Sequence, residues 1–315
     1  VTFNSDEIGN DPYGYNFRNA DLVEVLREKA NITNNLSIVV ENINKIQPET
    51  EEIRLVDAKG CEWTARLVVG ADGKNSGCRQ AAGIPSREVP LPQTALAFNI
   101  AHSDSHDLVS TEFHRANGPL TFVPLPGMHS SVVWVESPHE ADRLMKLAER
   151  EFRETLQKLS YGILGEIGEI GPIGRFPLVN LEAQKLAANR IALVGEAAHV
   201  VPPIGAQGLN LGFRDAATIA ELAGAAKKLG LDPGSSDVLD NYQRRRTSDI
   251  KTRSGLVNLL NRSVLSDLLP LQIARSAGLH ALATSRPLRR IAMKTGIGPL
   301  FDRFFEREDE KETNN

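Results

Sequence analysis

The stretch from Leu193 to Gly212 contains the residues whose types and spacing most clearly favour chemistry. An apolar run ends at Gly195, and the acidic Glu196 follows it directly. A proline-rich turn and further glycines then lead into a segment with helical spacing. Open α/β sheets bind ligands at the carboxyl ends of their strands. A carboxylate at such a strand end can accept hydrogen bonds from sugar hydroxyls, so the stretch is typical of a ligand site.

The turn and the helix start that follow Glu196 suit a flat, electron-accepting ring. Gly205 and Gly208 let the backbone approach such a ring because neither residue carries a Cβ. The free N–H groups at the start of the expected helix, residues 205–228, would stabilise negative charge on the ring. Gly195-Glu196 alone is explained more simply by a plain strand–loop–helix connection. The ordered set of Pro, Gly, Gln-Gly and Asn across the whole run favours a binding site.

A second strand end of interest lies earlier in the chain, at Asp72-Gly73. Residues 62–69 read as a strand that feeds this turn. Residues 76–82 read as a short helix that Gly83 stops. A strand followed by a tight Asp-Gly turn is common, so this motif alone leaves a binding role and a purely structural role equally open.

Together and in this order, the two motifs resemble those of FAD-dependent aromatic hydroxylases of the para-hydroxybenzoate hydroxylase type. The later motif usually has Gly-Asp, whereas this chain has Glu196, whose carboxylate stands one methylene further out. The earlier motif continues in the family with a serine and an arginine, as Ser76 and Arg79 do here. Residues 175–178 resemble the Phe-Pro-Leu strand of the ubiquinone-biosynthesis branch. The resemblance implies that the FAD-binding residues are Asp72, Gly73, Gly195, Glu196, Pro203, Gly205, Gly208, Leu209 and Asn210.

The resemblance also implies an activity, namely hydroxylation of a phenolic ring by a flavoprotein monooxygenase that uses NAD(P)H and O2. The ubiquinone branch favours a polyprenylphenol as substrate. Because the cofactor carries the redox chemistry, no side chain is predicted as a catalytic acid or base. Two alternatives stay open. One is a flavin hydroxylase for a soluble aromatic acid, which a basic residue facing the flavin from the substrate lobe would favour. The other is a non-catalytic scaffold or lipid-binding protein that retains the fold.

The family's glycine-rich Gly-x-Gly-x-x-Gly turn, which holds the FAD pyrophosphate, does not occur in this sequence. The chain opens with Val1, and its first residues read like the middle of a domain. We therefore expect an N-terminally truncated form that lacks the first βαβ unit. On this interpretation the fragment alone binds FAD weakly or not at all and is inactive.

Periodicity and the resemblance predict an α/β (α+β) fold with a Rossmann-like FAD-binding lobe, an inserted antiparallel-sheet substrate lobe and a helical C-terminal tail. We expect the FAD-binding lobe at 1–87 and 183–235, the substrate lobe at 88–182 and the helical region at 236–315. The expected helices are 19–30, which Asn19 would cap, and 138–159. The expected strands are 36–40, 53–56, 94–101, 110–115, 120–124, 131–136 and 190–194.

Composition narrows the class of protein and its partners. The 315 residues include 36 Lys and Arg against 40 Asp and Glu, which argues against a broad nucleic-acid footprint. Two cysteines make a disulfide framework improbable and favour a reducing cytoplasm. The histidines show no metal-ligand spacing. No apolar run approaches the roughly 18 residues of a membrane span.

Two features of the C-terminal region leave a membrane contact open. Arg244 to Arg246 read as a solvated helix face that could instead meet anionic lipid. The apolar residues between Leu256 and Leu269 could lie against a membrane surface, which would make the protein peripheral at an inner membrane. A ubiquinone-biosynthesis complex and a homo-oligomer are further candidate assemblies that the sequence does not decide.

Overall fold

The computed structural model describes residues 1–9, 12, 14–203, 207–265, 277–278 and 280–297. The chain divides into two compact units. One comprises residues 18–262, and the other comprises residues 1–17 together with 263–315. Both motif regions lie in the larger unit.

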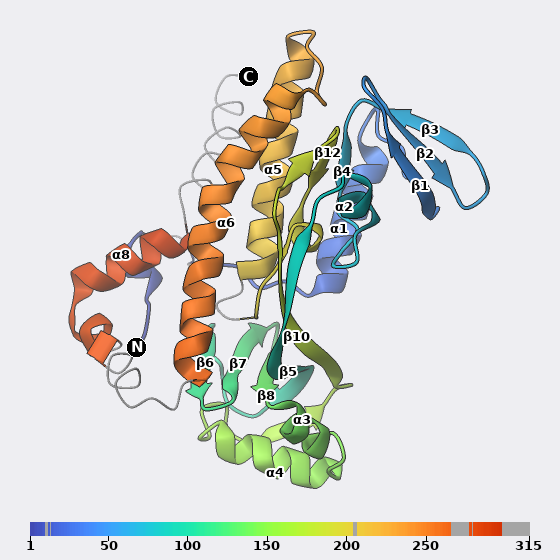
Figure 1. Cartoon of the computed structure of the whole chain (residues 1–315). Coiled ribbons are helices and arrows are strands. Elements are labelled where there is room, and N and C mark those ends of the chain that lie inside the picture. The colour runs from blue at the N-terminus through green and yellow to red at the C-terminus, as the bar shows by residue number, and fades with distance from the viewer. Residues whose placement is uncertain (10–11, 13, 204–206, 266–276, 279, 298–315) are drawn as a thin grey trace. The chain divides into compact units, whose positions relative to one another are not determined.

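An antiparallel sheet of seven described strands occupies the lower half of the larger unit in Figure 1. Its strand order is β13-β10-β5-β8-β7-β6, and β9 pairs with β5. The four strands expected between residues 94 and 136 are confirmed. Gly118 (φ 147°) and Gly127 (φ 73°) adopt backbone angles that favour glycine at the turns between them. The strands are β5 (Ser86–His102), β6 (Thr111–Arg115), β7 (Gly118–Leu125), β8 (His129–Glu136), β9 (Ile167–Ile170), β10 (Gly174–Ala183) and β13 (His199–Val200).

One face of this sheet packs against two helices, α3 (Pro138–Leu144) and α4 (Glu149–Leu159). Alternate strand residues supply the apolar core on that face because successive side chains of a strand point to opposite sides. These core residues include Leu96, Phe98, Ile100, Leu120, Phe122, Val132 and Trp134. The single helix expected over 138–159 is wrong. The backbone of Ala148 is extended (φ −61°, ψ 147°), so one helix cannot continue through it. Ala148 is instead the N-cap residue of α4.

A second sheet joins the two motif regions. In it β4 (Val68–Gly70) runs parallel to β12 (Ile191–Leu193), which also pairs with β11 (Ala187–Ala188). The expected strand 190–194 is thereby confirmed. The expected helix 76–82 is α2 (Gly77–Ala81), followed by Gly83 at φ 66°. Around this sheet lie η2 (Gly195–Ala197), α5 (Gln207–Lys228) and α6 (Ser236–Leu265).

The N-terminal part of the larger unit differs from expectation in three respects. Helix α1 (Asn19–Ile32) forms, but Arg18 is its N-cap residue and no side chain caps it, so Asn19 is not the cap. The expected strand 36–40 is wrong, because among the described residues no strand pairs with it and its apolar side chains are exposed. The expected strand 62–69 is divided between two sheets. Its first part is β3 (Glu62–Ala65), in an antiparallel sheet with β2 (Ile53–Asp57) and β1 (Ile43–Pro48).

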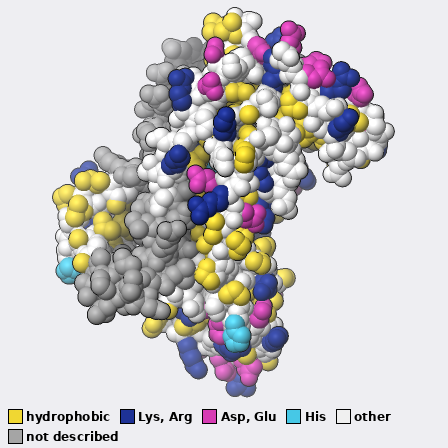
Figure 2. All heavy atoms as spheres, in the orientation of Figure 1, with side chains coloured by type: hydrophobic (Ala, Val, Ile, Leu, Met, Phe, Trp, Pro, Cys, Tyr) yellow, Lys and Arg dark blue, Asp and Glu magenta, His cyan; other side chains and the backbone are white. Residues whose placement is uncertain are grey.

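The smaller unit contains η1 (Ser5–Glu7) and α8 (Arg286–Ile297). Arg289 Nε lies 2.9 Å from the Glu7 carboxylate, so an ion pair links the two ends of the chain within this unit. The apolar tail residues 256–269 lie outside the part of the chain whose side chains are described. No helix in the described ranges is long and apolar enough to cross a membrane. Figure 2 shows basic and acidic side chains interspersed on the visible face.

Candidate cofactor-binding site

The two sequence motifs follow neighbouring parallel strands. Gly70 of β4 pairs in register with Leu193 of β12, and the Val194 amide donates to the Gly70 carbonyl at 3.0 Å. Because parallel strands end at the same edge of a sheet, the Asp72-Gly73 turn and Gly195-Glu196 emerge side by side. The structure therefore brings together two segments that stand more than a hundred residues apart in the sequence.

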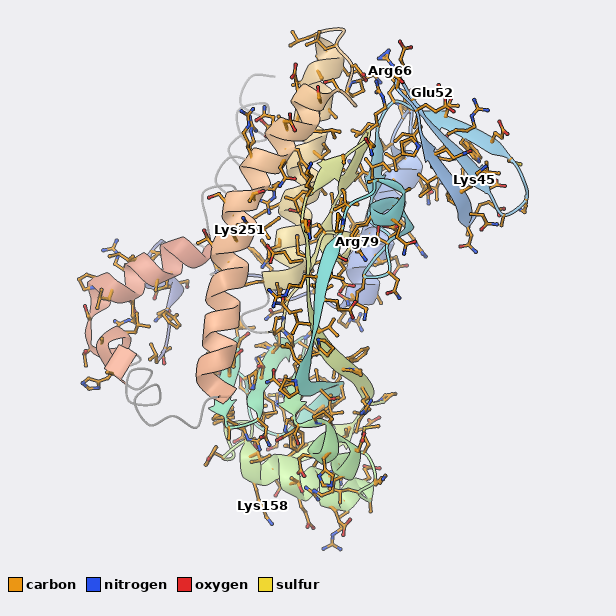
Figure 3. All side chains as sticks on the ribbon, viewed as in Figure 1. Lys45, Glu52, Arg66, Arg79, Lys158 and Lys251 are labelled. Carbon is orange, nitrogen blue, oxygen red and sulfur yellow. The ribbon has the colours of Figure 1, made fainter. Side chains whose placement is uncertain are left out.

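Arg79 of α2 connects the two motif loops directly. Its guanidinium donates to the Ala197 carbonyl at 2.9 Å and to the Lys74 carbonyl at 2.8 Å. The side chain is buried between these loops, and Figure 3 shows it at α2. The arginine of the earlier motif thus holds the backbone of both loops in place.

Asp72 uses both of its carboxylate oxygens to shape its own loop. One accepts from the Ser76 hydroxyl at 2.6 Å and the other from the Cys78 amide at 3.0 Å. Burial acts to raise the pKa of Asp72, but these hydrogen bonds outweigh it and the pKa lies below its ordinary value. Gly73 follows at φ 75° with open space where a Cβ would stand, so its backbone is accessible.

Glu196 is an exposed carboxylate at the carboxyl end of β12. No described residue forms a hydrogen bond or an ion pair with it. Gly195, at φ 58°, packs against Gly212 of α5, where an added Cβ would lie 3.3 Å from the Gly195 Cα. This backbone-to-backbone contact places η2 against the second turn of α5, so the carboxylate stands beside the start of that helix.

The remaining predicted residues lie on the loop and at the first turn of α5. Pro203 is half-buried in a bend that follows the buried Pro202, and Gly205 lies outside the described residues. Gly208 is exposed, and among the described residues an added Cβ there would come within 4 Å of Val201 alone, at 3.9 Å. Leu209, in the first turn of α5, is 56% exposed, and Asn210 is half-buried. The first turn of α5 thus presents backbone N–H groups and an apolar side chain at an accessible surface.

Sequence reasoning missed the carboxylate that holds this region together. Asp215 of α5 is fully buried and accepts three hydrogen bonds. The donors are the Gly195 amide at 3.0 Å, His199 Nε2 at 2.7 Å and Arg246 Nε at 2.7 Å. One signal was available: Asp215 follows the buried Leu211 by four residues, so it interrupts the apolar face of the helix.

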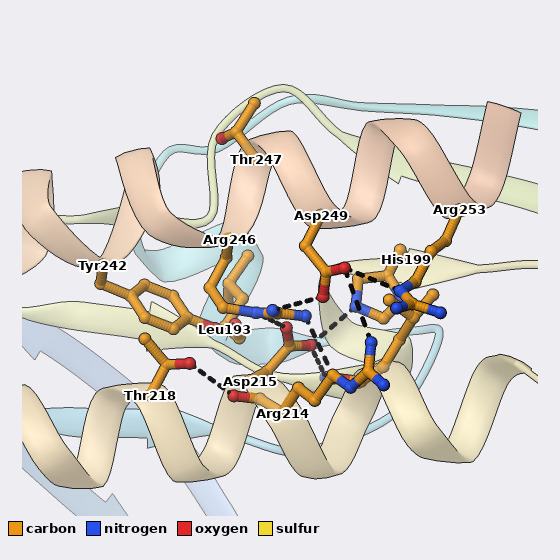
Figure 4. A network of polar contacts seen from close by, with 12 residues as sticks. Leu193, His199, Arg214, Asp215, Thr218, Tyr242, Arg246, Thr247, Asp249 and Arg253 are labelled. Atoms are coloured by element: carbon orange, nitrogen blue, oxygen red, sulfur yellow. Dashed lines mark hydrogen bonds and ion pairs between the residues drawn. The ribbon is translucent and has the colours of Figure 1, made fainter. Parts of the chain in front are cut away.

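The expectation that Arg244 to Arg246 form a solvated face is wrong for Arg246. Its side chain is 1% exposed and lies between α5 and α6, as Figure 4 shows. Burial acts to lower its pKa, but the charge of Asp215 and the hydrogen bonds of Asp215 and Asp249 raise it above the ordinary value. Arg246 therefore remains charged, because the buried carboxylate of Asp215 and the half-buried carboxylate of Asp249 face it.

The network continues along α6 towards the start of α5. Asp249 accepts from Arg246 and from Arg253, each at 2.7 Å, and Arg253 donates to the Gln207 side chain at 3.2 Å. Burial acts to raise the pKa of Asp249, but these two arginines lower it below the ordinary value. Gln207, the first residue of α5, is thereby linked to the same ionic network in which Asp215 contacts Gly195 of η2.

The buried His199 completes the network. Its Nε2 donates to Asp215, whose charge is balanced by Arg246, whereas its Nδ1 is buried without a hydrogen-bond partner among the described residues. A carboxylate can only accept, so the hydrogen on Nε2 is assigned from the network. His199 is therefore satisfied locally at one ring nitrogen and not at the other.

These features fit a dinucleotide with a flat ring. The exposed Glu196 can accept hydrogen bonds from sugar hydroxyls. Gly195 and Gly212 place no side chains where η2 meets α5. The start of α5 favours a negative charge on the ring. Two joined strand ends with these groups define the class as an α/β nucleotide-binding lobe. Residues 21–252 match the family described as FAD binding domain, and the chain belongs to that family.

Two relatives indicate the branch of the family. The ubiquinone hydroxylase UbiL of Rhodospirillum rubrum is 36% identical over 236 residues, which cover 75% of this chain and 55% of the relative. The 3-demethoxyubiquinol 3-hydroxylase of Escherichia coli is 29% identical over 300 residues, covering 95% of this chain and 76% of the relative. Measured against UbiL, the chain thus spans little more than half of the relative's length.

Two solved structures confirm the predicted fold class. PqsL of Pseudomonas aeruginosa, in complex with 2-aminobenzoylacetate, has a TM-score of 0.68 at 23% identity and covers 78% of this chain and 69% of its own. The p-nitrophenol 4-monooxygenase PnpA of Pseudomonas putida also has a TM-score of 0.68, at 20% identity, covering 86% and 69%. At these identities the likeness concerns the fold alone.

Proposed function

We propose that the protein acts as an FAD-dependent monooxygenase that hydroxylates a phenolic ring with NAD(P)H and O2, and that its substrate is a polyprenylphenol precursor of ubiquinone. Membership of the FAD binding domain family supports the cofactor. The printed names of two relatives, ubiquinone hydroxylase and 3-demethoxyubiquinol 3-hydroxylase, support the substrate class.

The observation that carries the proposal is the meeting of both motifs at one sheet edge, with Glu196 exposed beside the start of α5. In the proposed complex, Glu196 accepts from the hydroxyls of the cofactor's sugar or ribityl chain. The backbone at Gly73, Gly208 and Leu209 lies against the cofactor. FAD, when bound, would supply the redox chemistry between NAD(P)H, O2 and the phenol.

The chain's own contribution is position and charge. The N-terminus of α5 directs backbone N–H groups and the positive end of the helix dipole at the ring, which favours a negatively charged reduced form. Asp215 holds the Gly195 amide at the start of η2 and His199 just beyond its end. The geometry of the seat is therefore fixed before the cofactor arrives.

The described sheet surface favours a neutral phenol over a soluble aromatic acid. An aromatic acid calls for a cation near the ring. On the sheet face opposite α3 and α4, the described residues of β5 from 94 to 101 and of β6 to β8 include no Lys or Arg. Arg115 points to the helix-covered side, where it pairs with Glu136 at 2.7 Å. Arg175 pairs with Asp142 of α3 at 2.9 Å.

A peripheral membrane contact would give access to a polyprenyl substrate, and we include it in the proposal. It rests on the apolar residues between Leu256 and Leu269 in the sequence. Co-flotation of the full-length protein with anionic vesicles tests it. Protein that stays at the bottom of the gradient at low salt would contradict the membrane contact and leave the enzymatic proposal intact.

The enzymatic proposal is tested with the purified full-length protein. We expect it to be yellow and to oxidise NADH or NADPH faster when 2-prenylphenol is present. Mass spectrometry in ¹⁸O2 should find one labelled oxygen atom in the phenol. A colourless protein that takes up no added FAD would contradict the proposal and favour a non-catalytic scaffold. A yellow protein that oxygenates 4-hydroxybenzoate but not the prenylphenol would favour the soluble acid.

A further inference from the structure

The ionic network around Asp215 extends along α6 to the first residue of α5. Figure 4 shows Arg246, Asp249 and Arg253 of α6 facing Asp215 of α5. Asp249 accepts from Arg246 and from Arg253, each at 2.7 Å. Arg253 Nη1 in turn donates to the Gln207 side chain at 3.2 Å. A guanidinium group therefore lies within one hydrogen bond of the helix start that is proposed to face the flavin.

The position of Arg253 is unfavourable in terms of helix electrostatics alone. The N-terminus of a helix carries positive partial charge, so cations are disfavoured there and anions are favoured. The Arg253 side chain is nevertheless only 10% exposed at this end of α5. Arg214, which lies two turns into the same helix, is 7% exposed. Two largely buried cations near the positive end of a helix are stabilised when a negative charge binds beside them, so this arrangement favours an anionic ligand.

Guanidinium groups outnumber carboxylates in the described part of this network. Those of Arg214, Arg246 and Arg253 face the two carboxylates of Asp215 and Asp249. Burial lowers the pKa of Arg214 below its ordinary value, and the charges of Arg253 and Arg246 lower it further, while the charge of Asp249 opposes them. Positive charge is thus concentrated at this part of α5. Because the groups are largely buried, salt and water screen this charge less than they would at the surface.

We infer that the arginine cluster of Arg214, Arg246 and Arg253 raises the reduction potential of the bound flavin. This inference rests on the proposed function. When NAD(P)H is oxidised to NAD(P)⁺, its hydride passes to the ring with two electrons, which gives the ring one negative charge. The cluster stabilises that charge, and Arg253 contacts the helix start through Gln207. These residues act through their charge and do not touch the reacting atoms.

Two substitutions that break the same contact separate an effect of charge from an effect of structure. Arg253→Gln and Asp249→Asn each remove the ion pair between Arg253 Nε and Asp249 Oδ1, which lie 2.7 Å apart. Arg253→Gln removes a positive charge and should lower the flavin's reduction potential, whereas Asp249→Asn removes a negative charge and should raise it. We expect the ratio of reduced to oxidised flavin to change about tenfold in each direction, which equals about 30 mV for a two-electron couple. Loosening of α5 alone would shift both potentials the same way.

The potentials are measured on the full-length protein loaded with FAD, by equilibrium reduction against a dye of known potential. Arg253→Lys retains the charge, so its potential should match that of the parent. Arg244→Gln is the matched control, because it removes the same charge from an exposed position on α6. Solvent screens a charge at such a position, so this variant should also keep the parent's potential. An FAD titration of each variant shows that the cofactor is bound when its potential is measured.

The outcomes distinguish this inference from the proposed function. Equal potentials in the parent, Arg253→Gln and Asp249→Asn, or shifts of both variants in one direction, would contradict the inference and leave the proposed function intact. If Asp249→Asn does not fold, the two Arg253 variants decide, because an equal fall in potential for Gln and Lys would contradict a role of the charge. A parent that takes up no flavin would refute the proposed function, and this inference with it.

Discussion

Two regions of the larger unit each have an apolar core, but they differ in the charges that are buried beside it. The antiparallel sheet and its helices share an apolar core, in which Leu96, Leu120 and Leu156 are fully buried. The cofactor side has an apolar core as well, which includes Ile191, Leu193 and Leu211, and in addition it buries an ion pair, Asp215 and Arg246, at 0% and 1% exposure. Burial of apolar surface stabilises a fold but does not require one particular geometry of the contacts. A buried ion pair is costly to desolvate, so it is stable only when its atoms adopt one geometry. We infer from this difference that the sheet serves as a scaffold, whereas the ionic network holds the segment from Gly195 to His199 in the position proposed to contact the cofactor.

Asp215→Asn should produce the largest loss of stability. The substitution leaves the Arg246 guanidinium buried with one carboxylate fewer, which costs about 3–5 kcal/mol for a broken buried pair. It also weakens the hold on Gly195 and His199, so flavin retention should fall as well. Urea denaturation followed by circular dichroism measures the first effect, and flavin absorbance per protein measures the second.

Asp240→Asn is the control for that substitution, because Asp240 is exposed on the same helix as Arg246. A surface change of this kind should alter stability by less than about 0.5 kcal/mol. Equal stabilities of the two variants would mean that the Asp215 network does not hold the cofactor side together.

Leu156→Ala should destabilise the sheet region by roughly 3 kcal/mol through the lost apolar contacts and the cavity left behind. Leu156 is fully buried on α4, in the core that also contains Trp134. Tryptophan fluorescence during urea denaturation reports on this core. Flavin content at low denaturant should stay unchanged. A loss of flavin as large as that of Asp215→Asn would remove the contrast between the two regions.

The contrast also explains what the sequence could predict. Alternation and turn residues predicted β5 to β8, because each strand buries one face and the turns after β6 and β7 contain glycine. The motif strands β4 and β12 were predicted for a similar reason, since apolar runs ended at glycines. Their pairing joins residues far apart in the chain and was available only through the resemblance.

The polar network could not be predicted, because its members belong to three separate segments. Arg246 and Asp249 look like surface residues when their own helix is taken alone, and the position of Asp215 on the apolar face of α5 does not reveal its partners. Only the packing of α5 on α6 brings them together. The strand expected at 36–40 failed for the converse reason: its apolar residues are suited to a sheet, but no described strand lies beside it.

Acid should loosen the cofactor side through Asp249. Its pKa is lower in the folded protein than in the unfolded chain, so its stabilisation is present above the unfolded pKa of about 3.9. That stabilisation is lost as the pH falls through the folded pKa. We therefore compare the drop in the free energy of unfolding between pH 7 and a pH below about 4 in the two proteins. This drop should be smaller in Asp249→Asn than in the parent. If the free energy of unfolding falls equally with pH in the variant and the parent, Asp249 does not contribute to the acid sensitivity.

The smallest expected effect is a difference in thiol reactivity between the two cysteines. Burial and the nearby Asp72 raise the pKa of Cys78 to about 12, whereas Cys61 is exposed. A maleimide at pH 8 should therefore label Cys61 in the folded protein and reach Cys78 only after denaturation, because the thiolate is the reactive form. Peptide mapping by mass spectrometry gives the answer. Rapid labelling of Cys78 in folded protein would mean that the loop after Asp72 opens readily.

The flavin content of the purified full-length protein and of its Glu196→Ala variant tests the central claim most directly. Loss of a charged hydrogen-bond acceptor costs about 1.5–3 kcal/mol, so the variant should bind FAD roughly 10- to 100-fold more weakly in a titration. The control, Glu166→Ala, removes an exposed carboxylate from the sheet region and should bind like the parent. Equal FAD affinity for the parent and the Glu196→Ala variant, or no binding by the parent, would contradict a flavin seat at this strand end.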